Sequence, residues 1–140
     1  MLRFTTKTSY GIRALIYLAA IYDAKKPISL NTISKREGIS LIFLEQIFHK
    51  FKKCGLVKSI RGPKGGYILD KNPSGISIYD VVSVLEGDVY PGQCNTLQGK
   101  NCTKREKCAS KEVWDELTGQ IEKTLKGFTL KYLADRSGEK

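Results

Sequence analysis

Three of the four cysteines in this 140-residue chain lie in one short, polar segment. Cys94 and Cys102 are separated by seven residues, and Cys102 and Cys108 by five. Structural zinc sites usually contain a close Cys-x-x-Cys pair and a fourth cysteine or histidine ligand, and this segment has neither. Thiolates spread over a loop are typical of iron–sulfur ligation, and four nearby Lys and Arg residues stabilise thiolates. The spacing favours a cluster first, a thiol redox switch second and zinc third.

The fourth cysteine and the single histidine stand apart from this segment. Cys54 falls at the end of a predicted helix, where we expect a small side chain buried on the apolar underside. His49 has no second histidine with which to share a metal, so we expect a phosphate contact or a bystander. No leader and no membrane-spanning apolar run is evident, so we expect a cytoplasmic protein whose thiols stay reduced.

The positive charge is confined to the first half of the chain. Residues 1–71 hold 14 Lys and Arg against 4 Asp and Glu, whereas residues 72–140 hold 10 of each. The whole net charge of +10 therefore comes from the first half. Localised positive charge indicates a nucleic-acid surface, although a merely basic domain has the same composition. An anionic membrane surface is disfavoured because no basic amphipathic helix exposes Trp or Phe.

Helix-capping residues predict three helices in this basic half, followed by a β-hairpin. The second and third helices are joined by a tight turn containing Gly38, which is a helix-turn-helix pattern. Two β-prone runs flank the turn Gly62-Pro63-Lys64-Gly65-Gly66, so the hairpin forms the wing of a winged helix. The expected elements are helices from Thr8 or Ser9 to about Asp23, from Ser29 to Gly38 and from Ser40 to Cys54, with strands Val57–Arg61 and Tyr67–Leu69.

The second half predicts two further helices on either side of the cysteine segment. Ser77 and Asp80 resemble a capping box that opens a helix ending at Gly87. A last long helix follows Ser110 and stops at Gly127, and residues 130–134 form a short turn. We therefore expect a mainly α fold with a small β-hairpin wing: a winged helix-turn-helix domain over residues 1–87, a cysteine-bearing cluster loop over 88–109, and a dimerisation helix with a C-terminal turn over 110–140.

The predicted third helix has an apolar face and a polar face. Leu44, Ile47, Phe48 and Phe51 recur at helical spacing and form the core stripe. The opposite face carries groups that suit major-groove reading, since Gln pairs with adenine, Glu accepts from cytosine and Lys reaches phosphate, although any solvated helix face looks similar. Arg61, at the base of the wing turn, suits a narrow minor groove. The candidate DNA-binding residues are Ser40, Phe43, Glu45, Gln46, His49, Lys50, Lys53, Arg61 and Lys64.

The stretch ISLIFLEQIFHKFKKCGLVKSIRGPKGGYIL, residues 39–69, resembles the winged-helix signature of the IscR/NsrR family of bacterial regulators. The resemblance extends over nearly the whole chain, from LRFTTKTSYGIRAL through the three cysteines to the helix with Trp114. It implies that the three cysteines are cluster ligands, that Gln46 reads a base, and that Arg61 enters the minor groove. It also implies that Glu45 influences which DNA motif is accepted. The last helix would pair with its twofold mate through Trp114, Leu117, Ile121 and Leu125.

The chain departs from the family pattern at the fourth cluster ligand. In the IscR branch a histidine lies three residues after the last cysteine, where this chain has Lys111. In the nitric-oxide-sensing branch the fourth ligand is an acidic residue near the start of the partner's first helix. This chain has Ser9 at that position. The first cysteine spacing is also longer than the usual five residues. The candidate fourth ligands are Ser9, Glu106, Ser110, Glu112, water or a small thiol.

The sequence thus predicts a homodimeric, DNA-binding repressor of the IscR type controlled by an iron–sulfur cluster, with 2Fe–2S favoured over 4Fe–4S. The alternatives are a cofactor-free regulator controlled by thiol oxidation or a partner protein, and a nitric-oxide-sensing 4Fe–4S repressor. An enzyme is not expected, because the chain has no nucleophile–base pair and no phosphate loop. We accordingly expect neither a small-molecule substrate nor a membrane partner.

Overall fold

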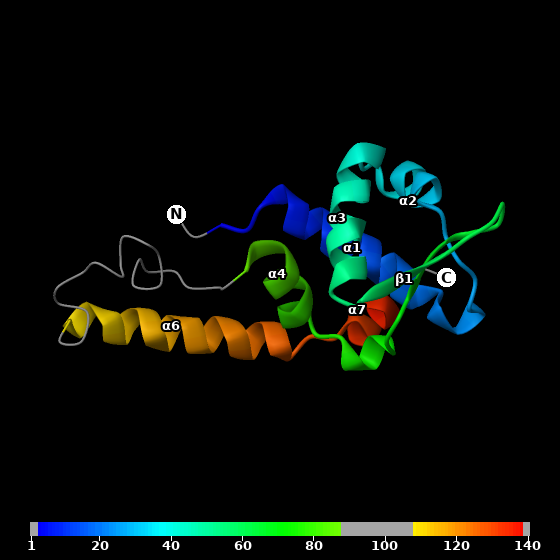
Figure 1. Ribbon diagram of the computed structural model, residues 1–140. Coiled ribbons are helices and arrows are strands. Elements are labelled where there is room, and N and C mark those ends of the chain that lie inside the picture. Colours follow the sequence, from blue (N-terminus) through cyan, green and yellow to red (C-terminus); the bar gives the residue numbers. More distant parts are fainter. Residues whose placement is uncertain (1–2, 88–107, 139–140) are drawn as a thin grey trace.

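The computed structural model describes residues 3–87 and 108–138, and its elements form a helical body with one projecting hairpin and one projecting helix (Figure 1). Cys94 and Cys102, with most of the predicted cluster loop, lie outside the described residues. The helices are α1 (Thr6–Ala20), α2 (Leu30–Glu37), α3 (Leu41–Lys53), α4 (Ile78–Glu86), α6 (Ala109–Lys126) and α7 (Leu130–Ser137), the strands are β1 (Val57–Ile60) and β2 (Gly66–Leu69), and the 3₁₀ turns are η1 (Tyr22–Ala24) and η2 (Pro73–Gly75).

The helix-turn-helix is confirmed, with the predicted capping residues at its ends. The Ser29 hydroxyl accepts from the backbone N–H of Thr32, and the Ser40 hydroxyl accepts from that of Phe43. Gly38 ends α2 with a φ of 68°, a left-handed conformation that glycine adopts at little cost. Because only Ile39 separates Gly38 from Ser40, α3 starts at once after α2 and is held against it.

The first helix begins and ends earlier than predicted. Its N-cap is Thr5, whose hydroxyl accepts from the backbone N–H of Thr8, so the prediction of Thr8 or Ser9 as the cap is wrong. Both of those residues lie inside the helix, and Thr8 is buried. The helix stops at Ala20, and η1 occupies the next residues that we had assigned to it.

The wing is a two-stranded antiparallel hairpin that projects from the helical body (Figure 1). Its register pairs Val57 with Leu69 and Ile60 with Gly66, so β1 ends one residue before the predicted end at Arg61. A side chain at position 66 would lie 2.3 Å from the carbonyl of Ile28, because an isolated bridge joins Ile28 to Tyr67 there. Only glycine lets the hairpin approach the α1–α2 connection this closely.

Helices α4 and α7, in the second half of the chain, pack against α1 in the first half. The predicted capping box is confirmed, since Ser77 and Asp80 each bond to the other's backbone N–H. A bridge between Ser77 and Thr129 joins the start of α4 to the start of α7. The turn predicted at 130–134 is instead a two-turn helix, because Leu130 and Ala134 are buried in the core.

One hydrophobic core joins α1, α3, α4 and the base of the wing. The predicted stripe of α3 and the apolar face of α4 are fully buried within it, which confirms both periodicities. Helices α1, α3 and α4 pack closely together at Gly11. A Cβ at this position would lie 2.6 Å from Leu85 of α4 and 3.0 Å from Phe51 of α3. Besides Phe51 and Leu85, the large buried residues are Leu15, Tyr17, Leu18, Ile33, Ile39, Leu44, Ile47, Phe48, Leu56, Val57, Leu69, Ile76, Ile78, Val81, Val82 and Leu130.

Candidate nucleic-acid interface and metal centre

The outer face of α3 is exposed along its whole length, opposite the buried stripe. Ile42 is 68 % exposed, which is unusual for an isoleucine beside a well-packed core. The other exposed side chains are polar or charged: Glu45, Gln46, His49, Lys50, Lys52 and Lys53. An apolar group among amide, imidazole and ammonium groups suits a base edge and its flanking phosphates.

Two of the candidate DNA-binding residues also have structural tasks. Ser40 caps α3, which orients the first turn of the helix. The ring of Phe43 is partly buried and meets the ring of Tyr10 edge-on, with 5.4 Å between the centroids. This pair joins α3 to α1. Arg13 of α1 in turn donates to the backbone oxygen of Glu37 at 2.7 Å, so α1 fixes both helices of the motif.

Sequence reasoning missed one residue of this surface. A shallow depression on α3 is lined by Ile42, Glu45, Gln46, His49, Lys50 and, from α1, Lys7. The predicted helix start at Thr8 or Ser9 leaves Lys7 outside the first helix, whereas α1 includes it. The signal that would have found it is Thr5 itself, since threonine is a preferred N-cap residue and its hydroxyl accepts from the backbone N–H three residues further on.

The wing presents a second basic surface. Arg61 and Lys64 are exposed, and they lie at the end of β1 and in the turn. Figure 1 shows the hairpin extending beyond the helices on the side where α2 and α3 meet. The exposed face of α3 and the tip of the wing are therefore two separate surfaces.

Glu86, at the end of α4, is joined to the start of α1. Its Oε1 atom accepts hydrogen bonds from the Thr5 backbone N–H at 2.8 Å, the Thr5 hydroxyl at 2.7 Å and the Thr8 hydroxyl at 2.6 Å. Burial acts to raise the pKa of Glu86, but the hydrogen bonds from Thr8 and Thr5 and the charge of Lys7 outweigh it and leave the pKa below its ordinary value. Gly87, with a φ of 78°, immediately precedes the segment that holds Cys94 and Cys102.

Of the three clustered cysteines, Cys108 is the one described. It is the N-cap of α6, and its Sγ lies 2.9 Å from the hydroxyl oxygen of Ser110. The positive end of an 18-residue helix favours a thiolate at this position. The predicted cap, Ser110, lies one residue inside the helix. Among the described residues no group of three His, Cys, Asp or Glu side chains could hold a metal ion.

Cys54 contradicts its prediction. We expected a buried side chain, but the residue is exposed. It follows the last turn of α3, and Gly55 then turns the chain with a φ of 80°, so Cys54 lies beyond the packed stripe that ends at Phe51.

Lys111 is the residue at which the family resemblance leads one to expect a histidine ligand. Its ammonium is 2.5 Å from a carboxylate oxygen of Asp115, one helical turn further on. An ammonium held by a carboxylate has no lone pair to offer a metal. Ser9, the other position of interest, is exposed on α1.

The long helix α6 projects from the body beside α4 and carries an apolar stripe (Figure 1). None of its residues is buried in the single chain described. Val113 is 58 % and Leu117 is 37 % exposed, while Trp114, Ile121 and Leu125 are half-buried. Leu125 packs against the core, so only the outer part of the stripe lacks cover. In the described part of the chain, no helix is long and apolar enough to cross a membrane.

Comparison with known proteins agrees with this architecture. Residues 4–136 match the family model Rrf2, described as an iron-dependent transcriptional regulator. The chain is 38 % identical over 130 residues to the HTH-type transcriptional regulator IscR of Escherichia coli, which covers 92 % of this chain and 78 % of that protein.

Two solved structures are also similar over nearly their whole length. IscR of T. potens has a TM-score of 0.79 at 34 % identity and covers 99 % of this chain and 90 % of its own. CymR, the global cysteine regulator of B. subtilis, has a TM-score of 0.81 at 34 % identity and covers 97 % and 98 %. These relatives are transcription regulators and not enzymes. The chain belongs to the Rrf2 family, and it is a DNA-binding transcription regulator with a winged helix.

Proposed function

We propose that this regulator is a homodimeric repressor whose operator binding is controlled by an iron–sulfur cluster held by Cys94, Cys102 and Cys108. The observation that carries the DNA-binding part is the exposed polar face of α3 beside a basic wing. The membership of the Rrf2 family supports the cluster, and 2Fe–2S is the type that we favour.

In this proposal α3 lies in the major groove and the wing lies over the adjacent minor groove. Gln46 pairs with a base edge, Glu45 tunes the accepted motif, and Arg61 enters the minor groove. Five residues contact phosphates or the groove wall: Ser40, His49, Lys50, Lys53 and Lys64. Phe43 acts through its packing on Tyr10, and Lys7 joins the phosphate contacts because it lines the same depression.

The outer stripe of α6 is the proposed dimer seam. Trp114, Leu117, Ile121 and Leu125 recur along one side of the helix, and Val113 adjoins them. A second copy of α6 would cover Val113 and Leu117, which the single chain leaves exposed. Two copies related by a twofold axis would present two reading helices to a palindromic operator.

The donor chemistry fits a cluster at the start of α6. Iron–sulfur clusters take thiolate ligands, and the position of Cys108 at a helix N-terminus favours that form. When bound, the cluster would supply a labile, redox-active centre whose presence reports iron–sulfur status. Lys111 is paired with Asp115, so the fourth ligand comes from the candidates Ser9, Glu106, Ser110, Glu112, water or a small thiol. The hydroxyl oxygen of Ser110 lies 2.9 Å from the Sγ of Cys108.

Glu86 supplies a route from the cysteine segment to the reading face. The segment starts directly after α4, and Glu86 ties the end of α4 to Thr5 and Thr8 of α1. Lys7, between those threonines, lines the depression on α3. A change in the cysteine segment that moves Glu86 would therefore shift α1 against α3.

Anaerobic reconstitution tests the proposal. The wild type and Cys54→Ala should each bind iron and sulfide and absorb in the visible range, whereas Cys102→Ala should not. Cys54→Ala is a matched control because it removes an exposed thiol of the same chain. Absence of iron from all three proteins would refute the cluster. DNA affinity, measured on duplexes selected from a random library, should then differ between cluster-loaded and cluster-free wild type.

A second candidate follows from the similarity to CymR. In that reading the regulator carries no cofactor, and oxidation of its thiols or a partner protein controls DNA binding. DNA binding by iron-free protein that changes on addition of peroxide, with a disulfide or sulfenate found by mass spectrometry, would favour it over the cluster.

A further inference from the structure

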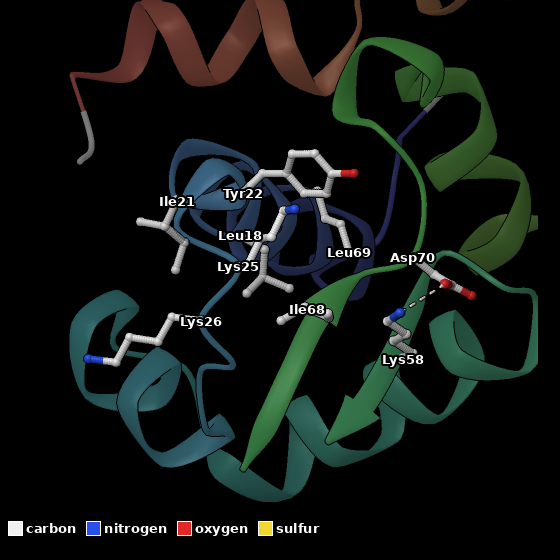
Figure 2. Close-up of a pocket in the computed structure, with 9 residues that line it drawn as sticks. All are labelled: Leu18, Ile21, Tyr22, Lys25, Lys26, Lys58, Ile68, Leu69 and Asp70. Carbon is white, nitrogen blue, oxygen red and sulfur yellow. Dashed lines mark ion pairs between the residues drawn. The ribbon is translucent and has the colours of Figure 1, made fainter. Parts of the chain in front are cut away.

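A pocket with a volume of about 310 Å³ lies between the end of α1 and the wing, and none of its lining residues belongs to α3 or α6 (Figure 2). Three structural units form its walls: the end of α1 with η1, the connection from α1 to α2, and both strands of the hairpin. The lining residues are Leu18, Ile21, Tyr22, Lys25, Lys26, Lys58, Ile68, Leu69 and Asp70.

The pocket combines an apolar floor with a cationic rim. Leu18 and Leu69 are buried at its base, and Ile21 and Ile68 are half-buried beside them. Three exposed lysines and one aspartate surround this floor, and Lys58 pairs with Asp70 at 4.0 Å. The rim therefore has an excess of two positive charges, on Lys25 and Lys26. A mostly apolar cavity with a few charged groups at one side is typical of small-ligand sites.

Lys25 has a backbone conformation that lysine rarely adopts. Its φ of 51° makes it the one non-glycine residue with positive φ among residues 3–87 and 108–138. It ends η1 by donating its backbone N–H to the carbonyl of Tyr22 at 3.1 Å. Glycine would fill this position without strain, as it does at Gly38. Strain tolerated at the rim of a cavity is a common sign of a functional side chain.

We propose that this pocket binds a small organic carboxylate, with its apolar body on the Leu18–Leu69 floor and its carboxylate at the ammonium of Lys25, while Lys26, which Figure 2 shows pointing outward, adds positive charge at the outer rim. Such a ligand would be an effector and not a substrate. The connection that carries both lysines is joined to β2, because Ile28 and Tyr67 exchange backbone hydrogen bonds at 2.8 and 3.0 Å. Occupancy would therefore tighten the wing, which carries Arg61, against α1.

Titration of the full-length protein with two carboxylates and their neutral analogues tests the site. The probes are 3-phenylpropanoate and octanoate, with 3-phenylpropanol and octanol as the uncharged partners. Amide resonances of residues 21–26 and 68–70 should shift saturably with a carboxylate, and affinity should be about tenfold weaker for the matching alcohol. Equal affinity for acid and alcohol, or the absence of saturable shifts with both acids, would overturn the proposal.

Three variants separate the charge from the fold. Lys25→Gln combined with Lys26→Gln should weaken carboxylate binding about tenfold, whereas Lys71→Gln, an exposed lysine just outside the pocket, should leave it within about twofold. Lys25→Gly should raise the unfolding temperature and still weaken binding, because it relieves the strain and removes the charge. Undiminished binding in the combined Lys25→Gln and Lys26→Gln variant and in Lys25→Gly would refute the assignment. None of these readouts depends on a cluster or on DNA.

Discussion

The contact between Glu86 and the start of α1 gives the sharpest prediction. One carboxylate oxygen accepts three hydrogen bonds, two of them from hydroxyls and one from a backbone N–H, and its partners lie 78 and 81 residues away in sequence. Thr8, one of the donors, is only 2 % exposed. Replacing Glu86 with Gln keeps an accepting oxygen but removes its charge.

The expected loss follows from the strength of these bonds. A hydrogen bond to a charged group contributes about 1.5–3 kcal/mol and a neutral one about 1 kcal/mol. Three bonds to one oxygen are not additive, and partial exposure of Glu86 weakens each of them. We therefore expect Glu86→Gln to lower the free energy of unfolding by about 1–2 kcal/mol at pH 7. In a Thr8→Val background the same substitution should have about 0.5–1 kcal/mol less effect.

Urea unfolding at fixed protein concentration measures the loss caused by Glu86→Gln in the wild-type and Thr8→Val backgrounds. The pH dependence of this loss tests whether the charge of Glu86 is its cause. Because folding lowers the pKa of Glu86, its contribution is present above the ordinary pKa of 4.5 and is lost as the pH falls through the folded-state value. The difference between wild type and Glu86→Gln should thus be full at pH 7 and shrink below about pH 4.5. A difference within about 0.3 kcal/mol of zero at pH 7, or additive effects of the two substitutions, would refute the reasoning.

Three further predictions concern DNA, packing and assembly. Arg61→Ala should weaken operator binding by about 1–3 kcal/mol and relax A·T preference beside the site; an unchanged footprint would count against the wing contact. Gly11→Ala should lower the free energy of unfolding by about 1–2 kcal/mol, because the added Cβ would meet Leu85. Gly119→Ala, on the exposed helix α6, should instead raise the free energy of unfolding by up to about 1 kcal/mol. Similar shifts in unfolding temperature for the two variants would contradict the close packing at Gly11. Leu117→Asp should convert a dimer into monomers by sedimentation velocity, with Lys131→Asp as the exposed control; a stable dimer would exclude this seam.

Local signals determined most of the fold before any tertiary information. The caps at Ser29, Ser40 and Ser77 and the stop at Gly38 depend on hydrogen bonds within three or four residues, so sequence spacing is sufficient to find them. The buried stripe of α3 follows from helical periodicity, and its exposed face follows by exclusion. The family, too, was evident from residues 39–69 and the presence of three cysteines downstream of them.

The predictions that were wrong concern features that depend on contacts between residues far apart in the sequence. Thr5, Thr8 and Ser9 all have capping side chains, and Glu86 selects Thr5 by binding its N–H and hydroxyl across 81 residues. Residues 130–137 become a helix because Leu130 and Ala134 find burial in the core. Cys54 is exposed because the helix ends there and Gly55 turns the chain before Leu56 returns to the core, which periodicity within α3 cannot reveal.

The sequence by itself determined the class of protein, the reading helix and the three clustered thiols, since capping, periodicity and motif spacing are all short-range properties. Only the tertiary structure placed Lys7 in the same surface depression as Gln46, joined Glu86 to α1, and brought Lys25 and Lys26 to the rim of an apolar pocket. Each of these arrangements depends on how separate elements pack. In a close-packed interior the position of one element depends on all of its neighbours, which are distant in sequence.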